Sequence, residues 1–302
     1  MAFDCYRDWV DEICHYTRIL LAWASLIMLA GACSVRYWSA AQTHSSFSVY
    51  YIAASLVRSN MNSDLYDGVK QGVNPQLEVA DPTTVFALTA KNHGIPSVML
   101  YLYPPTFADL LVPLTAFSPT VAFIIWDILN LIMLLATSAI LTRLFKIRAP
   151  GWTGLVTVFL ILFRPTLNCF YFGQVSILLL FLLIAGVSFY VHGRKNIAGL
   201  LFALAAAIKL TPLIVIVPFL AWKDWKILRA IALWCIGILG ATWIVNGIGT
   251  LNFYFLHVMQ SMSGGNLGVD KYSENNRTLG AIFYEYLRGL DHSTTPVGLV
   301  WG

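Results

Sequence analysis

Residues 197–220 read IAGLLFALAAAIKLTPLIVIVPFL, an apolar stretch that Lys209 and Pro212 interrupt near its middle. Each half holds about 12 residues and would reach only about 18 Å as a helix, less than the roughly 30 Å hydrocarbon core of a bilayer. Basic residues flank the stretch at both ends, within 192–195 and 222–229. Cytoplasmic loops collect Lys and Arg, so both ends are expected on one side of a membrane. The stretch therefore predicts either a re-entrant hairpin or two short helices buried in protein.

The composition of the whole chain agrees with a membrane protein. Its 302 residues are 58% hydrophobic and only 11% charged, and the mean hydropathy is +0.70. Soluble domains are about 45–50% apolar and about 25% charged, so a soluble enzyme, a coiled coil and a disordered chain are excluded. The net charge of +4 forms no basic stripe, so no nucleic-acid partner is predicted. The five scattered cysteines contain no CxxC pair, and no metal site or disulfide framework is expected.

We predict one all-α, polytopic, membrane-embedded domain over residues 1–302. A first span is expected at about 19–35, after an acid-containing leader that argues against a cleaved signal peptide. A long loop follows at about 36–97, in which 47–57 is expected to form a short amphipathic helix. A helical bundle is expected at about 98–246 and a polar tail at about 247–302. The apolar runs of the bundle are Val98–Ala116, Val121–Leu144, Gly154–Phe163, Val175–Tyr190, Ile197–Leu220 and Ile227–Val245.

The basic connections set the expected orientation. Residues 143–148, 192–195 and 222–229 are all basic, which predicts that they lie in the cytoplasm. The run 98–116 contains Pro104 and Pro105, which do not fit inside a regular helix, so we expect it to dip in and return. The long loop, the 167–174 connection, the Lys209 break and the tail then share the non-cytoplasmic face.

Lys209 is the first candidate for a functional side chain. A lysine within an apolar membrane run costs roughly 2.5–3.5 kcal/mol, and such residues usually face a cavity and mark function. Its expected partner is an anionic group, with phosphate preferred. The alternative is a lysine that snorkels to the surface. Arg277, after Asn276 and before a predicted helix at 278–287, would suit the same anion. The alternative for Arg277 is a solvated loop residue.

Other polar residues of the same predicted face have two interpretations each. Tyr103-Pro104-Pro105 either begins a helix or contributes to a site. Gln174 either caps a helix or hydrogen-bonds a substrate. A general base would have to come from an acid on this face. The candidates in the first loop are Asp64, Asp67, Glu78 and Asp81, and Asp109 and Asp127 lie at the expected membrane depth.

Four stretches together resemble one family. They are SFSVYYIAASLVRS followed by DLYD (46–67), YLYPPTFADLLVPL (101–114), FYFGQVSILLLFLL (170–183) and GLLFALAAAIKLTPLIVIVP (199–218). In this order they resemble glycosyltransferase family 87, polytopic transferases of the C-type superfamily that include polyprenol-phosphate-mannose-dependent α-1,2-mannosyltransferases. The resemblance covers roughly residues 19–290 and implies a C-type helical bundle.

The resemblance also implies a reaction. A sugar, by analogy mannose, passes from a polyprenyl-phosphate donor to a lipid or glycan acceptor on the outer face of a membrane, by analogy the bacterial cytoplasmic membrane. The donor is a co-substrate and no cofactor is expected, whereas the participation of a divalent metal stays open. Substrate binding is assigned to Tyr50, Tyr51, Tyr103, Gln174, Lys209, Asn276 and Arg277.

The chain departs from the family pattern in two respects. The family's D-F-x-x-Y-Y motif begins with an acid, whereas this chain has Ser46 there. Asp64, Asp67 or His44 would then act as the base, or the register differs, or the chain is catalytically weak. Family members also continue with further membrane helices, so a short or incomplete member is expected. Two alternatives follow: a non-catalytic relative, and a lipid or sugar transporter, since broken helices with a midplane lysine also occur in transporters.

Overall fold

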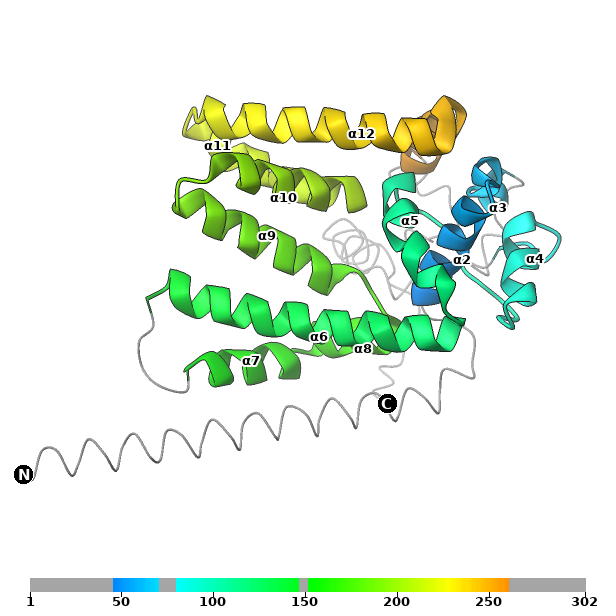
Figure 1. Ribbon diagram of the computed structural model, residues 1–302, viewed down its shortest axis with the longest axis horizontal. Helices are drawn as coiled ribbons and strands as arrows, with labels where there is room; N and C mark the ends of the chain where they lie inside the picture. The colour runs from blue at the N-terminus through cyan, green and yellow to red at the C-terminus, as the bar shows by residue number, and fades with distance from the viewer. Residues whose placement is uncertain (1–45, 71–79, 147–151, 261–302) are drawn as a thin grey trace, which may run out of the picture.

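The computed structural model describes residues 46–70, 80–146 and 152–260. Within these ranges the chain is helical and forms no extended strand. Long helices lie side by side in a bundle, and a layer of short helices covers one end of it (Figure 1). We call this covering layer the end layer and the opposite end of the bundle the basic end.

Two helices of the bundle are long and apolar enough to cross a membrane. They are α6 (Pro119–Leu144) and α12 (Trp225–Phe253), which continues into the π-helix η4 (Tyr254–Val258). A third candidate is the pair α7 (Trp152–Leu162) and α8 (Arg164–Phe172), which is bent by 67°. The bend follows from Pro165, whose ring prevents a continuous helix. The described residues therefore have the fold of a helical membrane protein.

The stretch around Lys209 reverses the direction of the chain. Helix α9 (Ser176–Val191) is followed by α10 (Lys195–Ile208), which runs from the basic end toward the end layer (Figure 1). Lys209 ends α10 because its backbone is extended, with φ −152° and ψ 135°. The 3₁₀ helix η3 (Thr211–Val215) and α11 (Ile216–Ala221) then lead back to the start of α12.

Small residues allow α9, α10 and α12 to pack closely. A Cβ added at Gly199 of α10 would lie 2.6 Å from the Cβ of Ala230 in α12. A Cβ added at Gly186 of α9 would lie 2.5 Å from Cε1 of Phe202. Helices in membranes associate through such close backbone approach, since lipid gives no hydrophobic driving force between them. These two glycines therefore fix α10 against both neighbours.

The end layer has its own core. It contains α2 (Ser46–Arg58), η1 (Asn62–Asp64), α3 (Asp67–Lys70), α4 (Val85–Asn92), α5 (Pro105–Leu111) and η2 (Val112–Ala116). Helix α2 is not the half-buried amphipathic helix that the sequence predicts, because every residue from Val49 to Val57 is buried. The buried hydroxyl of Ser55 is satisfied because it donates a hydrogen bond of 2.9 Å to the Tyr51 carbonyl. The run 98–116 supplies α5 and η2, which pack against α2.

The three basic connections meet at the basic end. They follow α6, join α9 to α10, and join α11 to α12 (Figure 1). The end layer, the α8–α9 junction and the end of α10, which Lys209 follows, lie toward the other end. Among the described residues, the basic connections and the end layer therefore lie at opposite ends of the bundle.

Candidate functional site

Two tyrosines from different parts of the end layer form the centre of the site. The hydroxyl of Tyr50, on α2, donates a hydrogen bond of 2.9 Å to the hydroxyl of Tyr103. Their rings meet edge to face with centroids 5.0 Å apart, and Phe107 packs against both. Tyr103 is held beside α2 because Pro104 and Pro105 start α5 directly after it.

The two tyrosines are neutral hydrogen-bond donors. Burial raises the pKa of Tyr50 well above its usual value, and Tyr103 raises it further. Burial also raises the pKa of Tyr103. Because Tyr50 donates to Tyr103, the hydroxyl hydrogen of Tyr103 is not used in this contact.

Lys209 lies beside the ring of Tyr103. Its Nζ is 6.0 Å from the centroid of the Tyr103 ring, and its side chain is only partly exposed. The break after Ile208 places the lysine at the end of α10, where its extended backbone directs it out of the helix. An ammonium over an aromatic ring is favourable, and it leaves the N–H donors of Lys209 able to bind an anion.

Gln174 approaches the cluster from the α8–α9 junction. Gly173 ends α8 in the left-handed conformation, with φ 64°, and its carbonyl accepts a hydrogen bond of 3.1 Å from Nε1 of Trp126. The Gln174 side chain interacts with Sγ of Cys169 at 3.8 Å. Burial is the largest cause of the raised pKa of Tyr103, and Cys169 also raises it. Gln174 thus contacts a residue that acts electrostatically on Tyr103.

Three other sequence candidates lie apart from this cluster. The Tyr51 hydroxyl donates to the Phe117 carbonyl at 2.8 Å, so Tyr51 ties α2 to the end of η2. Oδ2 of Asp67 accepts a hydrogen bond from the backbone N–H of Val85 at 3.0 Å, at the start of α4. Asp64 lies in η1, which packs against α12. His44, Asn276 and Arg277 lie outside the residues that the structure describes.

The structure adds one contact that the sequence does not predict. Both carboxylate oxygens of Asp109 accept hydrogen bonds from Nδ2 of Asn246, at 2.8 and 2.9 Å. Burial raises the pKa of Asp109 to about 6, although the hydrogen bond from Asn246 opposes the shift. Asn246 directly precedes Gly247, where α12 breaks with φ 77°. The sequence identifies Asp109 only as an acid at membrane depth, because its partner is 137 residues away.

The described cluster carries hydrogen-bond donors and a cation. Within the part of the chain that the structure describes, no group of three His, Cys, Asp or Glu side chains comes together. The cluster instead combines one ammonium with two neutral phenols. Donors of this kind bind the oxygens of a phosphate.

The comparisons with known proteins identify the family. Residues 101–302 match the sequence profile of glycosyltransferase family 87. The chain belongs to glycosyltransferase family 87. The match includes Tyr103, Gln174 and Lys209, and it begins after Ser46 and Tyr50.

One curated protein with a described activity resembles part of this family 87 member. It is the polyprenol-phosphate-mannose-dependent alpha-(1-2)-phosphatidylinositol pentamannoside mannosyltransferase of Mycolicibacterium smegmatis. The two are 28% identical over 155 residues, which are 51% of this chain and 37% of the relative. The chain therefore matches well under half of that protein. No solved structure matches the chain.

Proposed function

We propose that this protein transfers a sugar from a polyprenyl-phosphate donor to a hydroxyl group of a lipid or glycan acceptor. The observation that carries the proposal is the position of Lys209, at the end of a broken helix and beside the Tyr50–Tyr103 pair. The family supports glycosyl transfer, and the name of the relative supports mannose and a polyprenyl-phosphate donor.

The chemistry needs a cation near the leaving group. The acceptor oxygen attacks the anomeric carbon, the bond from that carbon to the phosphate oxygen breaks, and the phosphate leaves with the bonding electrons. Negative charge then grows on the phosphate, so donors placed there stabilise the transition state more than the ground state. In our proposal Lys209 and the hydroxyl of Tyr103 bind this phosphate, and Gln174 lies beside them.

The proton of the acceptor hydroxyl passes to a general base. Ser46 stands where the family has an acid, and a serine hydroxyl is too weak a base to act unaided. Asp64 is the preferred base, because Asp67 already binds the start of α4. Arg277 and Asn276 remain proposed as further phosphate ligands.

The membrane setting follows from the bundle. We propose a C-type helical bundle in the bacterial cytoplasmic membrane, with the site on the non-cytoplasmic side. The three basic connections at the opposite end support this orientation. The donor's lipid tail would lie along the apolar outer faces of the long helices.

Ser46 favours a second candidate function, a non-catalytic relative that binds the donor without transferring its sugar. Sugar transfer by purified protein in detergent separates the two, with polyprenyl-phosphate mannose as donor and mixed membrane lipids as acceptors. The first proposal expects transfer by the wild type that Lys209→Ala abolishes. Transfer that appears only in the Ser46→Asp variant supports the non-catalytic relative. Absence of transfer in both, combined with movement of the donor across vesicles, contradicts both and supports a transporter.

A further inference from the structure

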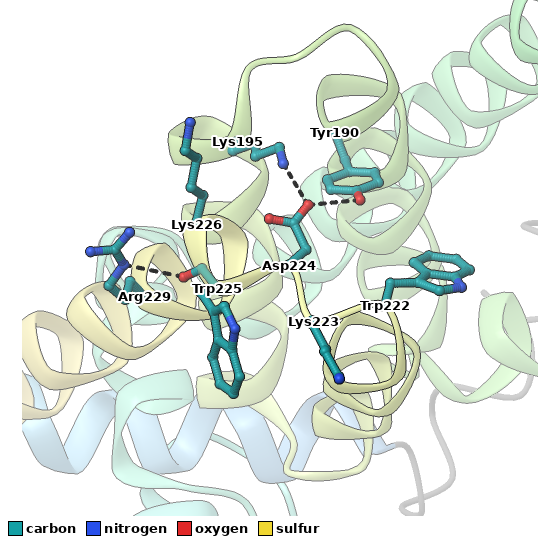
Figure 2. Close-up of a pocket in the computed structure, with 8 residues that line it drawn as sticks. All are labelled: Tyr190, Lys195, Trp222, Lys223, Asp224, Trp225, Lys226 and Arg229. Carbon is teal, nitrogen blue, oxygen red and sulfur yellow. Dashed lines mark hydrogen bonds and ion pairs between the residues drawn. The ribbon is translucent and has the colours of Figure 1, made fainter.

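A pocket lies at the basic end, remote from the candidate site. Its volume is about 580 Å³, and it opens between the end of α9, the start of α10 and the turn that joins α11 to α12 (Figure 2). Its lining residues are Tyr190, Lys195, Trp222, Lys223, Asp224, Trp225, Lys226 and Arg229. We propose that this pocket binds the phosphate headgroup of an anionic phospholipid.

The charge of the pocket is the first argument. Asp224 is the only acid among its lining residues, and its carboxylate is already engaged. Its Oδ2 accepts hydrogen bonds from Nζ of Lys195 and from the hydroxyl of Tyr190, and its Oδ1 lies 3.5 Å from the N–H of Ile227. Lys223, Lys226 and Arg229 therefore have no acid in the pocket left to neutralise them.

A neighbouring pocket extends the positively charged surface. Its volume is about 520 Å³, and it shares Lys195 and Lys226 with the first pocket. It adds Arg194 and the amide of Asn196, and no acid lines it. The two pockets together present an excess of cations over a surface large enough for the phosphate and glycerol of a lipid headgroup.

The position along the bundle identifies a lipid as the source of the phosphate. The pocket lies where the candidate span Trp225–Val258 begins. Trp222 and Trp225 border it, and 67% and 60% of their surfaces are exposed. Tryptophan side chains are enriched at the headgroup level of membranes, where the ring is partly apolar and its N–H is hydrated. Basic pockets at this depth are suited to anionic headgroups.

The backbone at Lys223 has a conformation that glycine adopts without strain. Lys223 has φ 54°, as Lys146 has φ 53° after α6. At the corresponding turn after α9 the chain uses Gly193, with φ 77°. Replacing Lys223 by glycine therefore removes the ammonium group without straining the backbone.

Native mass spectrometry of the full chain in detergent tests the proposal, with phosphatidylglycerol as the anionic probe and phosphatidylcholine as the neutral one. Replacing Lys223, Lys226 and Arg229 together by Gln is expected to weaken phosphatidylglycerol binding by at least roughly tenfold, since each cation near a membrane surface contributes about a factor of five. The charge-matched control replaces the exposed Lys91, Arg143 and Lys146 by Gln. An equal loss in the control would overturn the proposal, because net charge alone would then explain binding.

Lys223→Gly separates binding from folding. The substitution relieves the backbone strain, so the unfolding temperature is expected to stay the same or to rise while phosphatidylglycerol binding weakens. Wild-type binding in this variant would contradict a role for Lys223. Displacement of the lipid by millimolar inorganic phosphate would contradict a lipid site and indicate a site for free phosphate.

Discussion

The hydroxyl oxygens of Tyr50 and Tyr103 lie 2.9 Å apart, although 53 residues separate them in the chain. This contact joins the first helix of the end layer to the segment that begins α5. Nζ of Lys209 lies 6.0 Å from the centroid of the Tyr103 ring. Helix α2, which begins at Ser46, is thus linked through the two tyrosines to the lysine.

The Tyr103 hydroxyl is expected to matter for activity more than for stability. Tyr103→Phe removes one donor to the leaving phosphate, and a hydrogen bond to a charged group is worth about 1.5–3 kcal/mol, so transfer should fall by roughly 10- to 100-fold. Tyr101→Phe is the matched control, because the Tyr101 hydroxyl donates only to the Pro104 carbonyl at 2.8 Å. A Tyr103→Phe enzyme with wild-type rates in the transfer assay would contradict a role in phosphate binding.

Asp67 is expected to act on stability rather than on catalysis. Its carboxylate binds the N–H of Val85 at the start of α4, so Asp67→Ala should cost about 1 kcal/mol of unfolding free energy. Thermal unfolding in detergent measures the loss, and Asp67→Asn should keep most of the stability because its amide oxygen can still accept the bond. Loss of transfer in Asp67→Asn, without loss of stability, would instead make Asp67 the base.

Gly199 is expected to be intolerant of any side chain. In Gly199→Ala the new methyl group would meet Ala230 at 2.6 Å and the Ala230 backbone carbon at 2.9 Å, so α10 and α12 would have to separate. Overpacking of this kind costs about 1–3 kcal/mol. Gly237, on the same α12, has open space around its Cβ position. Gly237→Ala should therefore be neutral or stabilising by up to about 1 kcal/mol, and equal unfolding temperatures for the two variants would disprove the close contact.

The buried carboxyl of Asp109 predicts a pH dependence of stability. Asp109 belongs to α5, outside the candidate spans, and burial raises its folded-state pKa to about 6 from 3.8. Between these values the folded protein binds more protons than the unfolded chain, so stability falls as the pH rises from about 4 to 6 and is level above that. Asp109→Asn should flatten this part of the profile. An unchanged slope in that variant would assign the pH dependence to another group.

The long helices follow directly from the sequence. The run Val121–Leu144 corresponds to α6, which begins two residues earlier at Pro119, and Val175–Tyr190 corresponds to α9. Continuous apolar runs of this length specify a membrane helix with little dependence on the rest of the chain. The reversal at Lys209 is also visible locally, since a charged residue followed by Pro212 ends a helix.

Contacts between distant segments are not encoded in this local way. Residues 167–174 read as a connection because Asn168 and Gly173 are poor helix formers, yet α8 runs to Phe172 and is bent against α7. The Asp109–Asn246 contact depends on how α5 packs on α12. Sequence also cannot distinguish a carboxylate that binds a helix start, as Asp67 does, from one that acts as a base, because the two need the same residue type.

The most direct test of the central claim is the affinity of purified protein for a polyprenyl phosphate, measured for the wild type, Lys209→Gln and Lys209→Arg. We expect Lys209→Gln to weaken binding by roughly 10- to 100-fold, because a charged partner of the phosphate is lost, and Lys209→Arg to retain part of it. Lys91→Gln, an exposed lysine of α4, is the control and should bind like the wild type. Wild-type affinity in Lys209→Gln would contradict the assignment of the phosphate site.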